Sequence, residues 1–525
     1  MRAAAVVLAI AASCAAPQAI ARPKPKATPP VAGATAAPHI AVMRGADGWR
    51  ADLAFDGPLL GWALPRTPDR HRALMLLVGQ RPDAGEKASP APCTVREAAA
   101  SNDRDARLFR WRPESPERLE PLGAGLPAGA LESADLDGDG TEELLLVREG
   151  KIDLVTISSD GSAGTRALAD DGALGASLGG PRVSWDPRAA QDSALRVTLL
   201  GAFRTYRRDP EGRIAVGSEL AIPERVNPGA ERVRVVSPAV CPIGRTASGR
   251  MAFATEPEPL GRRRLRTLFL DPDGPPETQS VESWALFPTP ERVVDSAFAI
   301  LNGSPVLIVT TTSADKLSLL GEKALRVYPL GGDRTRAGDA PLFAATTGIN
   351  LWQVASPAVV DLDRDGRDDL VLSFWRGLKN SIAALEVYRG TASSFEKPRS
   401  LSFDVEGGEK GFLEFGADLD GDGRPDLMLL ANRELLVFPG SIPERAAQRP
   451  VETIPSRRIA LPELPTAHRM TFSAGADGFQ VQRVAGGLGT PHLLDLDGDG
   501  RAEALFAGDA ANGGGRVTVV FVRGP

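Results

Sequence analysis

The apolar residues of this chain fall into short runs separated by polar turns. Four of the runs directly follow acidic segments, at 144–147, 370–372, 427–430 and 504–506. Others directly precede such segments, at 357–360 and 492–494. Short apolar runs bounded by Asp and Gly turns are typical of β-strands. The pattern therefore predicts pairs of strands in which an acidic loop joins one strand to the next.

A second recurring segment lies downstream of the acidic ones. Its copies have alternating apolar positions and an aromatic near the end, and they span 324–330, 384–390 and 434–440, with a looser copy at 516–524. A period of two residues is expected for a strand with one buried face. Together the two segments predict a repeating unit of three strands, and we expect a fourth strand to complete it.

Other stretches keep the paired strands but lack the acidic residues. They lie at 73–78 with 108–111, 195–200 with 203–206, 250–255 with 265–270, and 305–310 with 324–330. With the acidic copies they make eight candidate hairpins, at a spacing of roughly 50–75 residues that suits propeller blades. The sequence thus predicts an all-β fold, a β-propeller of four-stranded antiparallel blades. Residues 40–56 are expected to supply outer strands that complete the last blade and close the ring.

The four acidic segments share one register, with Asp at positions 1, 3 and 5, Gly at position 6 and a carboxylate at position 9. Calcium is a hard cation that takes six to eight oxygen ligands, and alternate Asp side chains of such a loop can converge on it. The glycine permits the sharp turn, and the carbonyl of position 7 can point inward. We therefore predict up to four Ca²⁺ ions. The candidate ligands, with position 7 contributing its backbone carbonyl, are Asp135, Asp137, Asp139, Thr141, Glu143, Asp361, Asp363, Asp365, Arg367, Asp369, Asp418, Asp420, Asp422, Arg424, Asp426, Asp495, Asp497, Asp499, Arg501 and Glu503.

Two other interpretations of these loops fit the sequence less well. An EF-hand needs a bidentate Glu at position 12 and a helix on each side, but position 12 is apolar in every copy: Leu146, Leu372, Leu429 and Phe506. Bare hairpin turns would leave clustered carboxylates to repel one another in four matching loops. Magnesium tolerates crowded carboxylates less well than calcium does, and manganese stays open as an alternative. Calcium coordination closed by position 9, between two strands, fits the sequence better.

The acidic loops and their flanking strands resemble the FG-GAP/VCBS repeat family, whose blade unit also occurs in the propeller of integrin α-subunits. The four loops match that family's loop position by position, and residues 415–417 are the nearest match to its Phe-Gly signature. The resemblance implies a propeller of seven blades, with calcium held between the first and second strands of certain blades. The eight hairpins keep eight blades as the alternative.

The N-terminus has the features of an export signal. Arg2 precedes an apolar stretch at 3–12, and small residues stand at 19 and 21, as at a cleavage site. The apolar stretch is too short to span a bilayer, and no later segment does better, so we expect no transmembrane segment. A lipid anchor at Cys14 is the alternative processing, and in either case we expect a secreted protein or one in the periplasm or at the cell surface. The predicted divisions are a signal peptide at 1–21, a Pro/Ala-rich linker at 22–38 and the propeller at 39–525.

The remaining residues give weak signals for catalysis. Lys and Arg number 61 against 67 Asp and Glu, a net charge of −6, which argues against a nucleic-acid partner. The four histidines lack zinc spacing, and His492 is predicted to be a packing or surface residue. Ser177 stands in a Gly-x-Ser-x-Gly pattern, but its Asp, Gly and Pro neighbours indicate a loop rather than the strand and helix of a nucleophile elbow.

Two pairs of residues leave alternatives open. Trp352 and Trp375 flank the second acidic loop, and each either packs in the core or stacks on sugars from an exposed face. Cys93 and Cys241 are compatible with a disulfide and with two free thiols. On balance we predict a binding or adhesion scaffold for an extracellular protein or glycan. The alternative is a secreted carbohydrate- or ester-active enzyme with its site in the central depression of the propeller.

Overall fold

The computed structural model describes residues 37–66, 72–80 and 106–178, and between 182 and 522 it describes the strands and the acidic loops with gaps between them. The regular structure in these residues is β, apart from one short 3-10 helix, η2 (Gly172–Ala176). None of the described helical structure is long and apolar enough to cross a membrane. The residues from Ala37 onward form one compact unit. The predicted all-β class is therefore confirmed.

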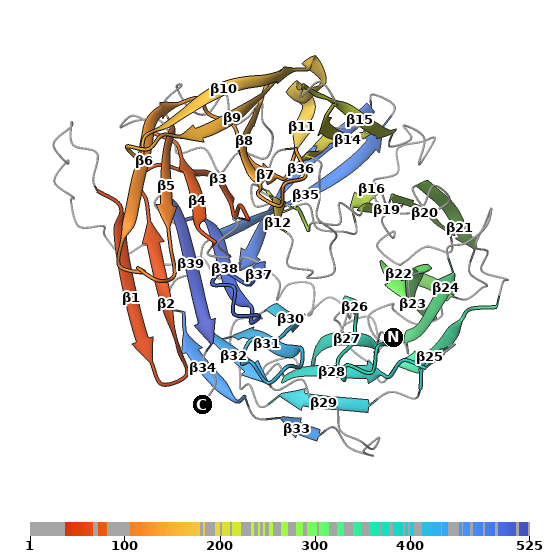
Figure 1. The fold of residues 1–525 in the computed structure, drawn as a ribbon. Coiled ribbons are helices and arrows are strands. Elements are labelled where there is room, and N and C mark those ends of the chain that lie inside the picture. The colour runs from red at the N-terminus through yellow and green to blue at the C-terminus, as the bar shows by residue number, and fades with distance from the viewer. Residues whose placement is uncertain are drawn as a thin grey trace, which may run out of the picture. The chain divides into compact units, whose positions relative to one another are not determined.

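The described strands form eight antiparallel sheets in succession, which we call blades 1 to 8 (Figure 1). Blades 1 to 3 comprise β3 (Leu59–Ala63), β4 (Leu74–Val78), β5 (Ala106–Trp111) and β6 (Leu119–Leu126); β7 (Ala130–Ala134), β8 (Glu143–Arg148), β9 (Lys151–Ile157) and β10 (Ala163–Asp170); and β11 (Ser177–Leu178), β13 (Leu195–Leu199), β14 (Ala202–Arg208) and β15 (Ile214–Ala221). Blades 4 and 5 comprise β16 (Val233–Val235), β19 (Met251–Thr255), β20 (Arg264–Leu270) and β21 (Ser280–Leu286); and β22 (Glu291–Leu301), β23 (Ser304–Ser313), β24 (Lys323–Pro329) and β25 (Phe343–Thr347).

Blades 6 and 7 repeat the same order of strands. They comprise β26 (Ser356–Val360), β27 (Asp369–Arg376), β28 (Ile382–Tyr388) and β29 (Arg399–Phe403); and β30 (Phe412–Ala417), β31 (Asp426–Ala431), β32 (Glu434–Phe438) and β34 (Arg457–Ala460). The fold is thus a β-propeller of four-stranded antiparallel blades, as predicted. The described strands give eight blades, which is the alternative number rather than the seven of the family that the loops resemble.

Blade 8 joins the two ends of the propeller. It is built from β37 (His492–Leu494), β38 (Glu503–Asp509) and β39 (Gly515–Val522), and then from β2 (Gly48–Ala54) and β1 (His39–Gly45). Strand β2 pairs with β39 from Gly48 opposite Val522 to Ala54 opposite Arg516. The rings of Trp49 and Phe521 stack across this pairing at a centroid distance of 4.0 Å. The expected contribution of residues 40–56 to the last blade is confirmed.

Several short strands extend the blades. A hairpin of β35 (Thr466–Gly475) and β36 (Gly478–Leu488) joins blade 8, and β17 (Val240–Cys241) pairs with β35. Strand β33 (Val451–Thr453) lies parallel to β29, and β12 (Arg182–Val183) lies parallel to β18 (Arg245–Thr246). Sequence reasoning predicted none of these pairings.

The hydrophobic core is divided among the spaces between neighbouring blades. Leu59, Trp62 and Phe109 of blade 1 pack with Val517 and Val519 of blade 8 in one cluster. Comparable clusters join blades 1 and 2, blades 2 and 3, and blades 7 and 8. Each sheet therefore buries both faces, which is why the runs at 144–147 and 427–430 are apolar throughout instead of alternating. This packing fixes the first two strands of each blade and hence the loops that join them.

Candidate metal centre

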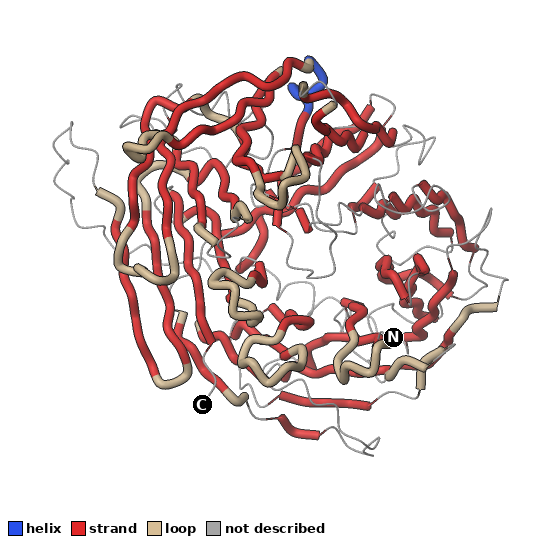
Figure 2. Tube along the Cα trace, in the orientation of Figure 1, coloured by secondary structure: helices blue, strands red, loops and turns tan. Residues whose placement is uncertain are grey.

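The four acidic segments form the loops between the first and second strands of four blades. Loop 1 (135–143) joins β7 to β8, loop 2 (361–369) joins β26 to β27, loop 3 (418–426) joins β30 to β31, and loop 4 (495–503) joins β37 to β38. They are among the tan segments of Figure 2. The position-12 residues, which exclude an EF-hand, all lie in the second strand and are fully buried: Leu146, Leu372, Leu429 and Phe506. The prediction of strands on both sides of each loop is confirmed.

Each loop turns sharply through two residues in the left-handed backbone region. In loop 3 these are Gly421 (φ 84°) and Gly423 (φ 87°), at positions 4 and 6. Loops 1 and 4 use glycine at the same two positions. Loop 2 has Arg364 at position 4, with a φ of 56°, although this region is unfavourable for a residue with a Cβ. All four loops therefore share one backbone shape.

The Asp at position 1 holds this shape by accepting backbone N–H groups from within the loop. In loop 3, Oδ1 of Asp418 accepts from the N–H of Gly421 at 2.7 Å, and Oδ2 accepts from Gly423 at 2.9 Å. Loops 1 and 4 have the same pair of bonds. The Asp at position 5 accepts from the N–H of position 7, for example Asp422 from Arg424 at 2.7 Å. The carboxylate at position 1 is thereby turned back over the loop, whereas the Asp at position 5 is exposed in every copy.

The carboxylate at position 9 comes from the second strand and closes the loop from below. It accepts the N–H of position 2 in every copy, at 2.7 Å for Glu143, 3.0 Å for Asp369, 2.8 Å for Asp426 and 2.6 Å for Glu503. Asp369, Asp426 and Glu503 are buried. Position 9 therefore has a role in folding the loop, in addition to the ligand role predicted from the sequence.

The loops bring oxygen atoms of three carboxylates together. One oxygen from each member lies within 4.8 Å of the others in Asp135, Asp137 and Glu143; in Asp418, Asp420 and Asp426; and in Asp495, Asp497 and Glu503. Loop 2 differs, because its group is Asp361, Asp363 and Asp365. There the second oxygen of Asp369 accepts the N–H of Gly390 at 2.7 Å. The structure thus gathers positions 1, 3 and 9 in three loops, and positions 1, 3 and 5 in the remaining one.

The carboxylates at position 9 are hard to ionise. Burial, with a smaller effect from neighbouring Asp residues of the same loop, raises the pKa of Glu503 to about 9, of Asp426 to about 7 and of Asp369 to about 6. Burial also raises the pKa of Glu143. Such shifts measure the cost of holding several carboxylates close together away from water. A divalent cation bound among them would remove that cost.

One atom of loop 3 is an unsatisfied acceptor. Asp426 is 1% exposed, its Oδ2 accepts the N–H groups of Leu419 and Asp420, and its Oδ1 is buried without a hydrogen-bond partner. A buried carboxylate oxygen without a partner is costly. It belongs to the residue whose carboxylate lies near those of Asp418 and Asp420. Hard oxygen donors in this number and spacing fit a calcium ion.

Arginine side chains reach three of the loops, and sequence reasoning missed them. Nη1 of Arg208, from β14 of blade 3, lies 3.0 Å from Oδ2 of Asp137. Nη2 of Arg389 lies 2.6 Å from Oδ2 of Asp363 in loop 2. Nε of Arg501 lies 3.5 Å from Oδ2 of Asp499 within loop 4. No ion pair joins loop 3 to any of the residues that the structure describes.

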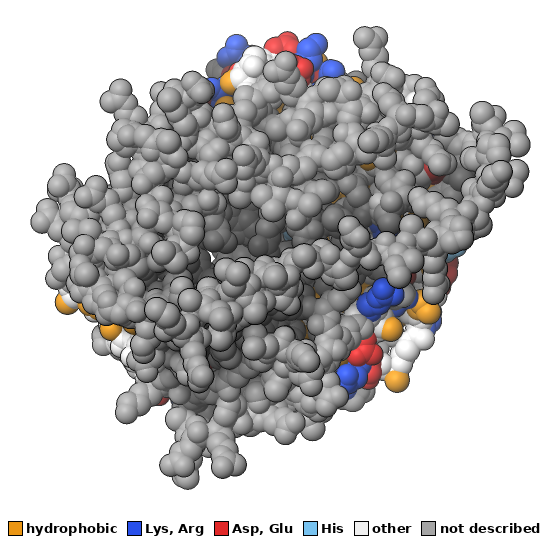
Figure 3. All heavy atoms as spheres, turned by 180° about the vertical axis from the view of Figure 1, so that it is seen from behind, with side chains coloured by type: hydrophobic (Ala, Val, Ile, Leu, Met, Phe, Trp, Pro, Cys, Tyr) orange, Lys and Arg blue, Asp and Glu red, His pale blue; other side chains and the backbone are white. Residues whose placement is uncertain are grey.

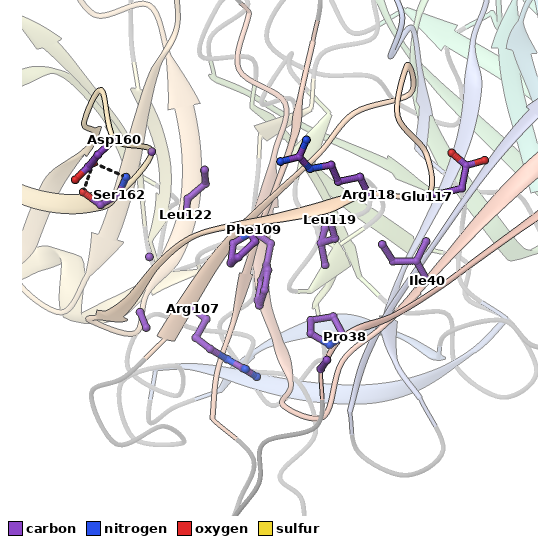
Figure 4. Close-up of a pocket in the computed structure, with 15 residues that line it drawn as sticks. Pro38, Ile40, Arg107, Phe109, Glu117, Arg118, Leu119, Leu122, Asp160 and Ser162 are labelled. Carbon is purple, nitrogen blue, oxygen red and sulfur yellow. Dashed lines mark hydrogen bonds between the residues drawn. The ribbon is translucent and has the colours of Figure 1, made fainter.

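A separate pocket of about 770 Å³ lies at the edge of the propeller, between β1, β5, β6 and the turn after β9 (Figure 4). Phe109 and Leu119 line it, and it is bordered by Glu117 and Asp160. Bonds from Arg44 to Glu117 and from Ser162 to Asp160 lower the pKa of both carboxyls. Since β1 and β6 are the outermost strands of their sheets, this pocket is not the central depression in which the enzyme alternative would place its site.

The remaining sequence predictions have mixed outcomes. His492 packs edge-on against Trp62, with ring centroids 5.2 Å apart, which confirms its predicted packing role. Ser177 begins the short strand β11 directly after helix η2, so the strand that a nucleophile elbow needs before its serine is absent there. Trp375 lies in β27 and Cys241 in β17. Residues 1–36, which include the export signal with Cys14, lie outside the described residues, as do Cys93 and Trp352.

On the face seen in Figure 3, described side chains of Lys, Arg, Asp and Glu lie next to one another at the rim. Ion pairs of this kind on the outer strands include Arg44 with Glu117 at 2.9 Å and Arg458 with Glu434 at 3.5 Å.

Comparison with known proteins gives matches among solved structures alone. No protein-family model matches the chain, and no curated protein matches it. BBS1N, solved in complex with ARL6DN, is 15% identical over 75% of this chain and 91% of its own, with a TM-score of 0.29. A Lactobacillus plantarum protein is 14% identical over 73% and 99% (TM-score 0.27), and a 6-phosphogluconolactonase candidate from Bacteroides uniformis is 13% identical over 78% and 99% (TM-score 0.29). At such scores the propeller fold is established by the strand pairing described above, and these proteins add nothing to the functional argument.

Proposed function

We propose that this protein is an exported, calcium-binding propeller of the FG-GAP/VCBS type that serves as a binding scaffold for an extracellular protein or glycan. The observation that carries the calcium proposal is the buried Oδ1 of Asp426, which lacks a hydrogen-bond partner beside two further carboxylates. A divalent cation there would supply the missing partner and the missing positive charge. The other three loops repeat the same backbone and donor types, which supports the same role for them.

The chain's own residues define what the metal would contact. Positions 1, 3 and 9 of loops 1, 3 and 4, and positions 1, 3 and 5 of loop 2, would hold it through carboxylate oxygens. The carbonyl groups of Thr141, Arg367, Arg424 and Arg501 would serve at position 7. Bound calcium would supply charge neutralisation and rigidity, so its binding free energy would add to the stability of the fold. Ordered loops on a rigid ring are a suitable surface for a partner.

Calcium titration of the metal-free full chain by calorimetry tests the first part of this proposal. We expect up to four bound ions, and a variant with Asp418→Asn and Asp420→Asn should bind one fewer. The matched control is Asp160→Asn, which changes an exposed acid in a turn outside the loops. The control should bind the same number of calcium ions as the unmodified protein. Absence of any calcium binding at millimolar concentration would overturn the proposal.

The scaffold role needs its own measurement. Immobilised protein should capture a partner from an extracellular protein fraction, or bind a glycan array, in calcium buffer and release it in chelator. The Asp418→Asn, Asp420→Asn variant should bind less in calcium, while Asp160→Asn should bind normally. Hydrolysis of glycosides or esters by the wild-type protein, without retention of a partner, would instead support the enzyme alternative.

A further inference from the structure

Loops 3 and 4 are joined by a backbone hydrogen bond. The N–H of Ala502 donates to the carbonyl oxygen of Asp418 at 2.8 Å. Ala502 is position 8 of loop 4, between the candidate ligands Arg501 and Glu503, and Asp418 is position 1 of loop 3. The bond therefore runs from the ligand-bearing end of one loop to the ligand-bearing start of the other.

A side chain spans the same junction. Nε of Arg501 lies 3.5 Å from Oδ2 of Asp499 in its own loop. The same atom would lie 2.5 Å from a Cβ placed on Gly421 of loop 3. The guanidinium thus lies against a backbone position where a Cβ would collide with it, and whose φ of 84° favours glycine. Any shift of loop 4 would be transmitted to the turn of loop 3.

The other loops lack this backbone bond to an acidic neighbour, although Nη1 of Arg364 in loop 2 would lie 3.3 Å from a Cβ placed on Gly423 of loop 3. In loop 1 the position-8 N–H, from Glu142, donates to the carbonyl of Arg66 at 2.9 Å. Arg66 follows the first strand of blade 1, whose first turn carries no acidic motif. In loop 3, position 8 is Pro425, which has no N–H to donate toward loop 2. Loop 2 follows blade 5, which likewise lacks an acidic loop. Among the described residues, a backbone hydrogen bond between two acidic loops is present only between loops 3 and 4.

We propose that loops 3 and 4 are a coupled pair of calcium sites, in which occupancy of one raises the affinity of the other, while loop 1 binds independently of them. This inference rests on the proposed calcium-binding function. A cation held by the Asp418 side chain fixes the carbonyl that Ala502 uses, and a cation in loop 4 fixes the Ala502 N–H between its two ligands. Binding at one site therefore orders part of the other loop, which lowers the entropic cost of binding the second ion. One hydrogen bond of ordinary strength corresponds to a coupling of about twofold to tenfold in affinity.

The test is a calcium titration of metal-free full-length variants by competition with a fluorescent chelator. Replacing Asp495 and Asp497 by Asn should abolish calcium binding at loop 4 and also lower the calcium affinity of one remaining site by about twofold to tenfold. Adding Asp418→Asn and Asp420→Asn should abolish that weakened site, which identifies it as loop 3. The matched control replaces Asp135 and Asp137 by Asn, and it should remove the loop 1 site and leave the affinities of the others unchanged.

A second set of variants tests the link itself. Ala502→Pro removes the N–H and gives loop 4 the proline that loop 3 already has at position 8, so the loop shape should tolerate it. In that background, loss of the calcium site in loop 4 should no longer lower the calcium affinity of loop 3. Arg501→Gln serves the same purpose if the proline variant unfolds, as judged by its circular dichroism. Independent binding of calcium by all sites would overturn the coupling and leave the proposed function intact, whereas absence of calcium binding in the wild-type protein would overturn the proposed function.

Discussion

Asp426→Asn should change the stability of the protein in opposite directions with and without calcium. In the metal-free protein, burial and the neighbouring Asp residues raise the pKa of Asp426 from 3.8 to about 7. Because this folded-state pKa is raised, the folded protein holds the proton more tightly than the unfolded chain does. The resulting penalty is absent below pH 4, grows as the pH rises and is complete above pH 7.

The magnitude follows from the size of that rise. A difference of about three pH units corresponds to roughly 4 kcal/mol of destabilisation above pH 7, and Asn cannot incur it. The amide brings one new N–H group into a buried position, which costs about 1–3 kcal/mol if it finds no acceptor. We therefore expect the variant to be more stable than the wild type by about 1–3 kcal/mol in chelator at pH 8. Calcium at a thousand times its dissociation constant should stabilise the wild type by about 4 kcal/mol. The variant lacks this stabilisation, so in calcium it should be less stable than the wild type by about 1–3 kcal/mol.

Urea unfolding followed by tryptophan fluorescence, with EDTA and with calcium at pH 8, measures both differences. Asp160→Asn is the control, since Asp160 is exposed, and it should shift neither curve appreciably. A repeat at pH 4.5 in EDTA should remove most of the advantage of Asp426→Asn. Equal destabilisation of Asp426→Asn in EDTA and in calcium would refute the reasoning, because a purely structural carboxylate would behave in that way.

Three further substitutions address other parts of the fold. His492→Phe should leave stability nearly unchanged at pH 7.5 and should make the protein more stable than the wild type at pH 5. Burial lowers the pKa of His492 to about 4, so the wild type loses stability as the pH falls from 6.5 toward 4. Equal pH dependence of the urea midpoints of the two proteins would contradict this. Trp49→Ala should lower the free energy of unfolding by about 3–5 kcal/mol, because it removes the stack on Phe521 that closes blade 8. The control Met43→Ala, on the exposed edge strand, should lower it little. Similar urea midpoints for the two variants would argue against closure through β2. Arg364→Gly should raise the unfolding free energy by up to about 1 kcal/mol, because it relieves a left-handed residue; a lower midpoint would indicate that the side chain has a stabilising contact.

The sequence predicts what is encoded within one blade. Each acidic loop with its two apolar strands is a local pattern, and the loop bonds of Asp418 and Asp426 connect residues at most seven positions apart. The closure of blade 8 was also predictable, because the strand residues near Trp49 lack a partner of their own. These features depend on periodicity and turn chemistry, which a single sequence displays directly.

Contacts between blades were not predictable in the same way. Arg208 reaches Asp137 from the next blade, and Arg501 lies against Gly421 of the preceding one; nothing near either arginine in the sequence indicates its partner. The second oxygen of Asp369 is taken by Gly390, so loop 2 gathers a different set of carboxylates although its motif is the same. The hairpin of β35 and β36 was missed because 466–488 has no acidic loop or regular apolar run to mark it.

These differences make the four loops chemically distinct. In loops 1 and 2 an arginine from outside the loop already offsets part of the negative charge, and in loop 4 the arginine comes from the loop itself. In loop 3 no carboxylate forms an ion pair with a described residue, although the guanidinium groups of Arg501 and Arg364 lie against its backbone at Gly421 and Gly423. Among the four loops as described, loop 3 alone combines a buried carboxylate oxygen without a partner with a proline at position 8. Burial raises the pKa of Glu503 in loop 4 to about 9 and that of Asp426 in loop 3 to about 7, so the cost of folding without metal, and the stabilisation by calcium, should be greatest in these two loops. Because loop 4 donates a backbone bond to loop 3, the consequences of metal loss should spread from blade 7 into blade 8, where the two ends of the propeller are joined.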